Sequence, residues 1–172
     1  TLPDGSSDLR AIHSVFAQLE QLVQKKSEIV IRSTLPPGTL SSLREAYPAL
    51  FDKSCVCVYP EFLREGSAVE DFVSPQLTVV GTASQRAFDI MNELYEFTGD
   101  QVLRVNPEVA EIIKYINNTY HALKVAFANE VGQIAVEMSI DPQHVTDIFV
   151  ADTKLNISPC YLRPGGPYGG SC

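Results

Sequence analysis

The sequence has no apolar run near the roughly 18 residues that a membrane-spanning helix needs, and we expect no signal peptide. Basic residues are few: 13 Lys and Arg stand against 21 Asp and Glu, which gives a net charge of −8. They are scattered, whereas binding a nucleic-acid backbone needs clustered Lys and Arg, so we expect no nucleic-acid partner. A small phosphorylated ligand stays possible because it needs only a few local cations and backbone N–H groups.

Cysteine is scarce as well, with four in 172 residues. Cys55 and Cys57 alternate along a predicted strand, so their side chains face the same way. No further ligands stand nearby at a suitable spacing, and we therefore predict no metal site. We interpret this pair as ordinary interior thiols and expect a cytoplasmic protein.

Strand and helix patterns alternate in the first part of the chain, which is typical of an α/β domain. Asp8 is a candidate N-cap for a helix whose apolar residues follow at helical spacing. The remaining pattern predicts strands at 28–33, 55–60, 77–81 and 101–105, and helices at about 39–50 and 84–98. We therefore expect the later βα units of a parallel sheet.

The pattern changes at Pro107, where helical periodicity begins and continues to about residue 138. At 1.5 Å per residue this helix would be about 48 Å long, too long for a crossover helix in a compact βαβ unit. A second helix should begin at Asp141-Pro142, an N-cap followed by Pro at the first helical position. The domain boundary is therefore expected near residues 100–107, with one domain over 1–104 and a helical one over 105–172.

In a doubly wound sheet, ligands bind beyond the carboxyl ends of the strands. The loops expected there are 33–38 and 59–61, and both carry small polar or charged residues. A glycine-rich dinucleotide-binding turn does not occur in the sequence. If a cofactor binds, we expect its first βα turn to lie upstream of Thr1.

One face of the long helix is polar, and its members fall within about 80° of one another on a helical wheel. They are Lys114, Asn118, His121, Val125 and Asn129. The opposite face is apolar and comprises Ile112, Ile116, Leu123, Phe127 and Ile134. One interpretation is a solvated face opposite a core face. The other is a face that hydrogen-bonds an oxygen-rich ligand, because Asn and His are weaker helix formers than the residues that solvated faces favour.

Acidic residues follow the second predicted strand. Glu61 comes directly after it and Glu65 four residues later, and a carboxylate there can act as a general base or position a water. The alternative is a charged loop that faces solvent, and we assign Glu70 and Asp71 to that alternative.

The last residues, RPGGPYGGSC, are too rich in Gly and Pro for the interior of a regular helix or strand. They can bring backbone N–H groups close to a ligand beside the thiol of Cys172. A nucleophilic thiol needs its pKa lowered by a cation or a helix N-terminus, and Lys114 and Arg163 are the available cations. The alternative is a tail that ends in an incidental cysteine.

Four segments appear in the order and at the spacing of the UDP-glucose/GDP-mannose dehydrogenase family, which the chain resembles over nearly its whole length. They are STLPPGT at 33–39, PEFLREGSAVEDF at 60–72, EIIKYINNTYHALKVAFANEVG at 111–132 and YGGSC at 168–172. The resemblance implies the C-terminal part of a Rossmann-like NAD-binding domain, followed by a truncated central helical dimerisation domain. Within the family, residues 154–172 are most similar to the GDP-mannose 6-dehydrogenases of alginate synthesis, although Cys160 replaces a Tyr.

The resemblance implies that a sugar nucleotide is oxidised at its C6 alcohol to the carboxylate in two steps, with two NAD. Cys172 would attack the C6 aldehyde to give a thiohemiacetal, which hydride transfer converts to a thioester. Lys114 and Asn118 would hold the developing oxyanion and the reacting water, a contribution that is typically large in catalysis. Glu61 would serve as acid and base in thioester hydrolysis.

Binding roles follow from the same resemblance. Thr34 and Glu65 would contact NAD or lie beside it. The residues implied to contact the sugar nucleotide are His121, Asn129, Tyr161, Arg163 and Gly166. The long helix would form a homodimer interface. GDP-mannose is the favoured substrate, UDP-glucose or UDP-N-acetylmannosamine are alternatives, and a non-catalytic helical dimerisation module is the second class of function. We expect the chain to be an internal fragment that is inactive alone.

Overall fold

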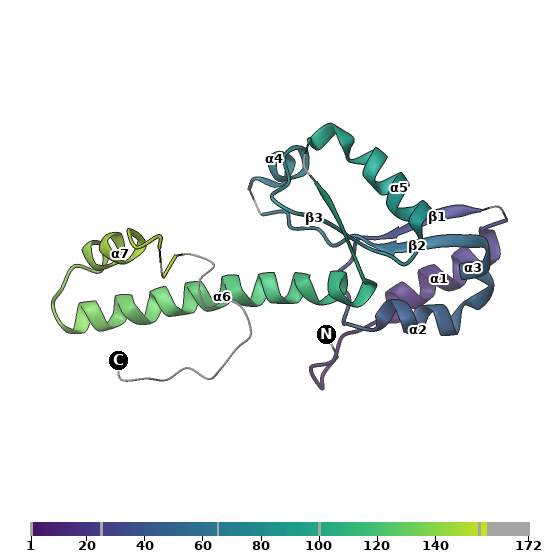
Figure 1. Cartoon of the computed structure of the whole chain (residues 1–172). Helices are drawn as coiled ribbons and strands as arrows, with labels where there is room; N and C mark the ends of the chain where they lie inside the picture. The colour runs from purple at the N-terminus through teal and green to yellow at the C-terminus, as the bar shows by residue number, and fades with distance from the viewer. Residues whose placement is uncertain (1, 25, 65, 100, 155, 158–172) are drawn as a thin grey trace, which may run out of the picture. The chain divides into compact units, whose positions relative to one another are not determined.

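The computed structural model describes residues 2–24, 26–64, 66–99, 101–154 and 156–157. The chain divides into two compact units, Thr1–Asn118 and Thr119–Cys172. The first unit has an α/β architecture and the second is helical, as the sequence predicts (Figure 1). The elements in chain order are α1 (Arg10–Leu22), β1 (Ser27–Ile31), α2 (Thr39–Ala46), α3 (Pro48–Lys53), β2 (Ser54–Val58), α4 (Ala68–Val73), β3 (Thr78–Gly81), α5 (Gln85–Leu94), η1 (Glu96–Thr98), β4 (Val102–Val105), α6 (Pro107–Glu137) and α7 (Pro142–Val150).

The strands form one sheet in the order β1-β2-β3-β4, and it is mostly parallel. The pairs β1–β2 and β3–β4 are parallel, whereas β2 meets β3 in antiparallel orientation through the single residue pair Val58 and Gly81. The prediction of a parallel sheet is therefore wrong at this junction. The reason lies in the connection, because α4 has only six residues, about 9 Å of helix, and does not return the chain to the opposite end of β2.

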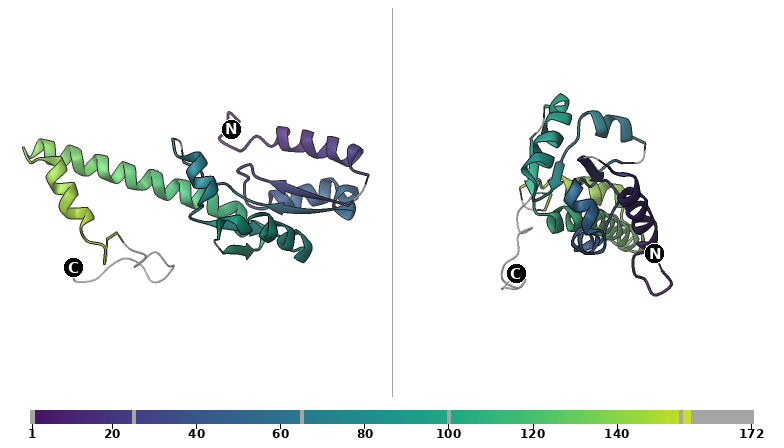
Figure 2. Two further views of the ribbon diagram at one scale, coloured as in Figure 1. Left: turned by 90° about the horizontal axis from the view of Figure 1, so that it is seen from above. Right: turned by 90° about the vertical axis from the view of Figure 1, so that its right-hand side faces the viewer.

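Helices cover both faces of the sheet, and side chains alternate between the two faces along each strand. Val56 and Val58 of β2 join a core cluster with Phe16 of α1 and with leucines of α2 and α3. Cys57 joins a second cluster with Met91 of α5. The views in Figure 2 show α1 on one face and α5 on the other. The first unit is therefore a three-layer arrangement.

Two predicted helices are interrupted. The helix expected over 39–50 divides into α2 and α3 at Tyr47, which has φ −129° and ψ 53°. Pro48 causes the break, because a residue that precedes proline disfavours the helical region and proline donates no backbone hydrogen bond. The helix expected over 84–98 ends at Leu94, and η1 then leads to Gly99, whose φ of 70° suits glycine.

The start of α6 packs closely against the end of β3. A Cβ atom placed on Gly81 would lie 2.5 Å from Ala110 Cβ and 2.9 Å from Pro107 Cα. Ala110 is itself fully buried. Glycine at 81 is therefore required by the close approach of helix and strand rather than by its backbone angles.

In the second unit, α7 begins as predicted, since the Asp141 carboxylate accepts a hydrogen bond from the backbone N–H of Gln143 at 3.0 Å. The rings of Phe127 and Phe149 lie 5.6 Å apart, centroid to centroid. The apolar face predicted for the long helix is exposed, including Leu123, Phe127 and Ile134. Within the described residues of this single chain, the interpretation in which this face packs into a core is not supported. Among those residues, no helix is both long and apolar enough to cross a membrane.

Candidate active site

The last residues of the strands form one continuous row, which we call the strand-end row. Ile31 pairs with Val58, Val58 with Gly81, and Gly81 with Val105. The antiparallel junction thus joins the carboxyl ends of β2 and β3. The loops that follow all four strands therefore begin along this row. The loops 33–38 and 59–61 therefore lie at the carboxyl ends of paired strands, as expected, although the sheet is not fully parallel.

The loop after β1 carries Thr34, whose side chain is exposed. Leu35 is buried in the core next to it, so the loop is anchored close to Thr34. A second anchor is Glu111 of α6, whose carboxylate accepts hydrogen bonds from the backbone N–H groups of Gly38 at 2.6 Å and Leu40 at 2.7 Å. These N–H groups belong to the first turn of α2, so Glu111 caps that helix from a distant part of the chain.

The loop after β2 carries Glu61, which is half-buried. Its neighbour Phe62 presents its ring to Lys114 of α6, whose Nζ lies 5.5 Å from the ring centroid. Lys114 is only 8% exposed, which is unusual for lysine and shows that its ammonium is held against this loop. The structure therefore brings the predicted cation and the predicted carboxylate to the same loop, within the first unit.

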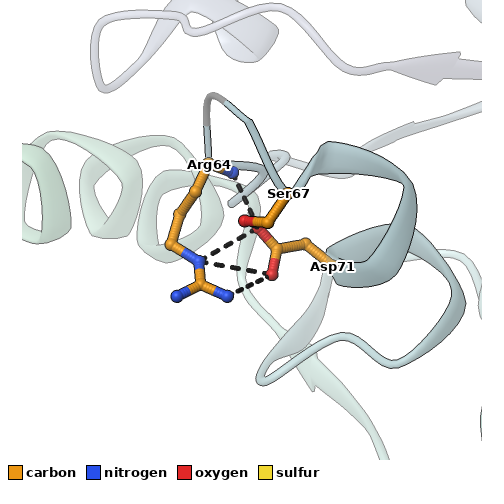
Figure 3. Close-up of polar contacts among 3 residues, drawn as sticks. All are labelled: Arg64, Ser67 and Asp71. Atoms are coloured by element: carbon orange, nitrogen blue, oxygen red, sulfur yellow. Dashed lines mark hydrogen bonds and ion pairs between the residues drawn. The ribbon is translucent and has the colours of Figure 1, made fainter.

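The remainder of that loop is organised by Asp71 (Figure 3). Its carboxylate accepts hydrogen bonds from the backbone N–H of Arg64 at 2.8 Å, from the Arg64 guanidinium at 2.6 Å and from the Ser67 hydroxyl at 3.2 Å. The hydrogen bonds from the Arg64 side chain, followed by the one from its backbone, lower the pKa of Asp71 to about 2. Asp71 is 8% exposed, so its assignment to a solvent-facing loop is wrong. Glu70 is exposed, as expected.

A second cation lies at the strand-end row. The Arg32 guanidinium follows β1 and stands 4.9 Å from the ring centroid of Tyr59 and 5.9 Å from that of Phe72. Tyr59 in turn lies 4.8 Å from the Tyr95 ring. Burial, together with a hydrogen bond to Tyr95, raises the pKa of Tyr59, which keeps its phenol neutral. The aromatic cluster thus fixes α4 against the ends of β1 and β2.

The other predicted site residues are not brought together by the described structure. Asn118 is exposed on α6 in the first unit, and His121 and Asn129 are exposed on the part of α6 that belongs to the second. Five predicted site residues lie outside the described residues: Glu65, Tyr161, Arg163, Gly166 and Cys172; Cys160 lies outside them as well. Among the described residues, no group of three histidine, cysteine or carboxylate side chains is placed to hold a metal ion.

The described cysteines are free thiols, and both pack with the cluster beneath α5. This confirms that Cys55 and Cys57 share a face of β2. Cys57 is fully buried, and this burial raises the pKa of its thiol to about 12. Cys57 is therefore chemically inert at neutral pH, because the thiolate is the nucleophile.

Sequence reasoning missed Glu111 and Phe62. Glu111 stands three residues before Lys114 and so belongs to the same helix face, a spacing that was available as a signal. Gly38 gave a second, indirect signal. It is the N-cap residue of α2 and has no side chain, so the first N–H groups of that helix need an acceptor from elsewhere. Phe62 carried no signal, because an aromatic residue in a loop most often packs on the nearest core.

Comparison with known proteins places these features in a family. Residues 1–98 match the NAD-binding domain of the UDP-glucose/GDP-mannose dehydrogenase family, and residues 108–172 match the central domain of the same family. Together the two matches define the class of the fold. The chain belongs to the UDP-glucose/GDP-mannose dehydrogenase family.

Individual relatives agree with this assignment. The GDP-mannose 6-dehydrogenase of Pseudomonas aeruginosa is 39% identical over 98% of this chain and 41% of its own length. The UDP-glucose 6-dehydrogenase of Rickettsia prowazekii is 31% identical over 98% of this chain and 39% of its own length. A crystal structure of a ternary complex of GDP-mannose dehydrogenase from Pseudomonas aeruginosa superposes with a TM-score of 0.92 at 36% identity, over all of this chain and 42% of that one. The chain thus spans about two fifths of the length of these relatives.

The described residues fit part of an NAD site. Thr34 offers an exposed hydroxyl at the carboxyl end of β1, the position at which such sheets bind ligands. The N-terminus of α2, which would otherwise attract a phosphate, is already occupied by the Glu111 carboxylate. The residues that would contact NAD therefore belong to the loop before α2, and the N-terminus of α2 would not bind its phosphates.

Proposed function

We propose that this chain is part of an NAD-dependent sugar-nucleotide 6-dehydrogenase that oxidises the C6 alcohol of GDP-mannose to the uronate. The observation that carries the proposal is the position of Lys114, a buried lysine held against the loop of Glu61, in a chain of this family. In this proposal Lys114, Asn118, Glu61 and Cys172 are the catalytic residues. Bound NAD accepts the hydride in each of the two oxidations.

Cys172 acts on the product of the first oxidation. Its sulfur forms a bond to C6 of the aldehyde while a proton passes to the former carbonyl oxygen, which gives a thiohemiacetal. Loss of a hydride and a proton from that carbon and oxygen leaves a thioester. Attack of water on the thioester then breaks the C–S bond, which releases the carboxylate and returns the thiol.

Lys114 stabilises negative charge on the oxygen at C6. Lys114 as a whole residue is 8% exposed, so its charge is screened less by water than that of a surface lysine. Asn118 stands four residues later on α6, and its amide donates to the same oxygen or to the attacking water. Glu61 takes the proton of that water. Glu61 is half-buried and precedes Phe62, whose ring contacts Lys114, which supports this role.

Binding roles in the proposal belong to other residues. Thr34 and Glu65 lie on the NAD side. The sugar nucleotide is held by His121, Asn129, Tyr161, Arg163 and Gly166. The free thiols of Cys55 and Cys57 agree with a cytoplasmic enzyme.

Substrate turnover tests the proposal in the full-length protein that carries this chain. NADH formation at 340 nm is followed with GDP-mannose, UDP-glucose and UDP-N-acetylmannosamine, and kcat/KM is compared. The proposal expects the highest kcat/KM with GDP-mannose. A higher kcat/KM with either UDP sugar would show that this sugar nucleotide is the substrate instead of GDP-mannose. No NADH from any of the three would refute dehydrogenase activity.

The exposed apolar side chains of the second unit favour one further function, assembly of a homodimer through α6. Leu123, Phe127 and Ile134 are each more than half exposed, and side chains of this size at an interface exclude water on association. The chain by itself would then be a dimerisation module without dehydrogenase activity. Sedimentation of the isolated chain as a dimer, with no NADH formed, is the expected outcome. A monomer, or measurable turnover by the isolated chain, would contradict it.

A further inference from the structure

Glu111 is the most completely buried acidic residue among those described, with 1% of its surface exposed. Its two carboxylate oxygens accept separate hydrogen bonds, one from the N–H of Gly38 at 2.6 Å and one from the N–H of Leu40 at 2.7 Å. A buried carboxylate is costly unless its oxygens are satisfied, and charge-assisted bonds of this length are the strong kind. The carboxylate therefore fastens α6 to the loop between β1 and α2.

Local capping cannot replace this contact. The residue before α2 is Gly38, which has no side chain and a φ of 89°, a backbone conformation that strains other residues. A Ser, Asp or Asn cap at this position is therefore disfavoured, although these residues usually satisfy the first N–H groups of a helix. The cap comes from α6 instead, so forming it also sets the distance between two elements.

Each partner of the contact lies beside a proposed functional residue. Thr34 stands in the same loop, four residues before Gly38, with buried Leu35 next to it. Lys114 stands three residues after Glu111, on the same face of α6, and is also buried. One turn of α6 therefore holds both the anchor of the Thr34 loop and the cation of the proposed reaction.

We propose that Glu111 is a positioning residue that keeps the NAD-side loop, residues 34–40, in register with Lys114. This inference rests on the proposed function. Because the Glu111 carboxylate already fills the N-terminus of α2, a cofactor phosphate does not bind there, and the loop acts through its position. Loss of the contact therefore weakens NAD binding and misplaces the loop relative to Lys114, while contacts to the sugar nucleotide on the later part of α6 are unchanged.

The central variant is Glu111→Gln in the full-length protein. Glutamine keeps the size of the side chain, but its amide nitrogen is a donor and cannot accept from a backbone N–H. Glu111→Asp keeps the charge with a shorter reach. The matched control is Glu108→Gln, because Glu108 is exposed one turn earlier on α6 and also contacts α2, accepting from the Ser41 hydroxyl at 3.3 Å.

The first readout is the Kd of NADH, measured by fluorescence without sugar nucleotide. We expect Glu111→Gln to raise it by about tenfold, the scale of one lost charge-assisted hydrogen bond. The Kd of NADH for Glu111→Asp should lie between the values for Glu111→Gln and for the unchanged protein. Glu108→Gln should have the same Kd as the unchanged protein. In turnover, Glu111→Gln should raise the KM for NAD and lower kcat without changing the KM for the sugar nucleotide. A lower Tm with an unchanged Kd for NADH would overturn the proposal, since that is the result of a purely structural role.

A measurement on the unchanged protein keeps the proposal testable if the variants fail to fold. Hydrogen–deuterium exchange is followed at the amides of Gly38 and Leu40 with and without NADH. The proposal expects slower exchange at both amides when NADH is bound, and unchanged exchange would overturn it. Neither binding nor exchange uses a sugar nucleotide. A protein that binds NADH in this way but oxidises no sugar nucleotide would therefore refute the proposed function and leave the role of Glu111 intact.

Discussion

The Nζ atom of Lys114 lies 5.5 Å from the centre of the Phe62 ring, so the loop after β2 and the first turns of α6 meet at a single cation. A lysine that is 8% exposed keeps little of its hydration, and the aromatic face compensates for part of that loss. The contact also fixes the ammonium against the loop that carries Glu61, the sequence neighbour of Phe62. The proposed chemistry depends on this arrangement.

Replacing Lys114 should therefore affect kcat. We expect Lys114→Met to lower kcat by about 10²–10³-fold, the usual cost of removing one group that stabilises an oxyanion. Initial rates of NADH formation in the full-length protein measure it. The matched control is Lys124→Met. Like Lys114, Lys124 is a lysine of α6 that stands over an aromatic ring, in this case that of Tyr120, but Lys124 is exposed. Equal losses in the two variants would contradict the assigned role of Lys114.

Asp71 should make the stability of the loop dependent on pH in the acid range. Its folded pKa is lowered to about 2, so the unfolded state binds the proton more tightly than the folded state. The stabilisation is fully present above the unfolded pKa of about 3.9 and is lost as the pH falls through about 2. We expect the difference in unfolding free energy between the unchanged protein and Asp71→Asn to shrink between about pH 4 and pH 2.

Urea unfolding at a series of pH values measures that difference. Glu70→Gln is the control, since Glu70 is the exposed neighbour of Asp71 on α4 and accepts none of the hydrogen bonds from Arg64 or Ser67. The difference in unfolding free energy between Glu70→Gln and the unchanged protein should vary less over the same pH range. A difference for Asp71→Asn that stays constant down to pH 2 would show that the Arg64 contact does not lower the pKa of Asp71.

Two glycines should respond oppositely to alanine. At Gly81 the new Cβ would meet Ala110 Cβ at 2.5 Å and the backbone of Pro107 at 2.9 Å, so α6 must move away from β3. We expect a loss of about 1–3 kcal/mol in the free energy of unfolding, the usual cost of overpacking. At Gly132, within α6, nothing lies within 4 Å of the new Cβ, and alanine should stabilise by about 0.5–1 kcal/mol. Thermal unfolding compares the two variants, and a neutral Gly81→Ala would show that α6 does not pack on β3 as described.

The thiols should differ in reactivity. Burial raises the pKa of Cys57 to about 12, so this thiol should react with iodoacetamide only after unfolding. Mass spectrometry of tryptic peptides, taken as NADH formation declines during alkylation, measures which cysteine is modified. The proposal expects loss of activity to follow modification of Cys172. Loss of activity in step with Cys57 modification would contradict both assignments.

Much of the fold could be predicted from local patterns. All four predicted strands are present, although only β2 and β3 are buried along most of their length, and Asp141 caps α7 as its position before Pro142 indicates. The antiparallel junction of β2 and β3 could not be predicted, because periodicity gives the faces of a strand and not its direction. The division of α2 from α3 was visible in Pro48, which outweighs the helical spacing of the residues around it.

The candidate site was less accessible to sequence reasoning. Lys114 stood out because a polar stripe on a long helix is a local pattern. Asp71 did not, because α4 has only six residues, too few for a periodicity from which burial can be inferred. The contact of Glu111 with Gly38 joins residues far apart in the chain. Such a contact depends on how β1, α2 and α6 pack. The exposed apolar face of α6 shows the same limit, since the pattern indicates that a face is apolar but not what covers it.

The central claim is that the parent protein oxidises a sugar nucleotide through a thioester on Cys172. Its most direct test compares the unchanged full-length protein with Cys172→Ser, using a limiting amount of GDP-mannose and an excess of NAD. The account predicts two NADH for each GDP-mannose in the unchanged protein, and no steady turnover in Cys172→Ser, which should still bind GDP-mannose. Steady formation of the uronate by Cys172→Ser would contradict it.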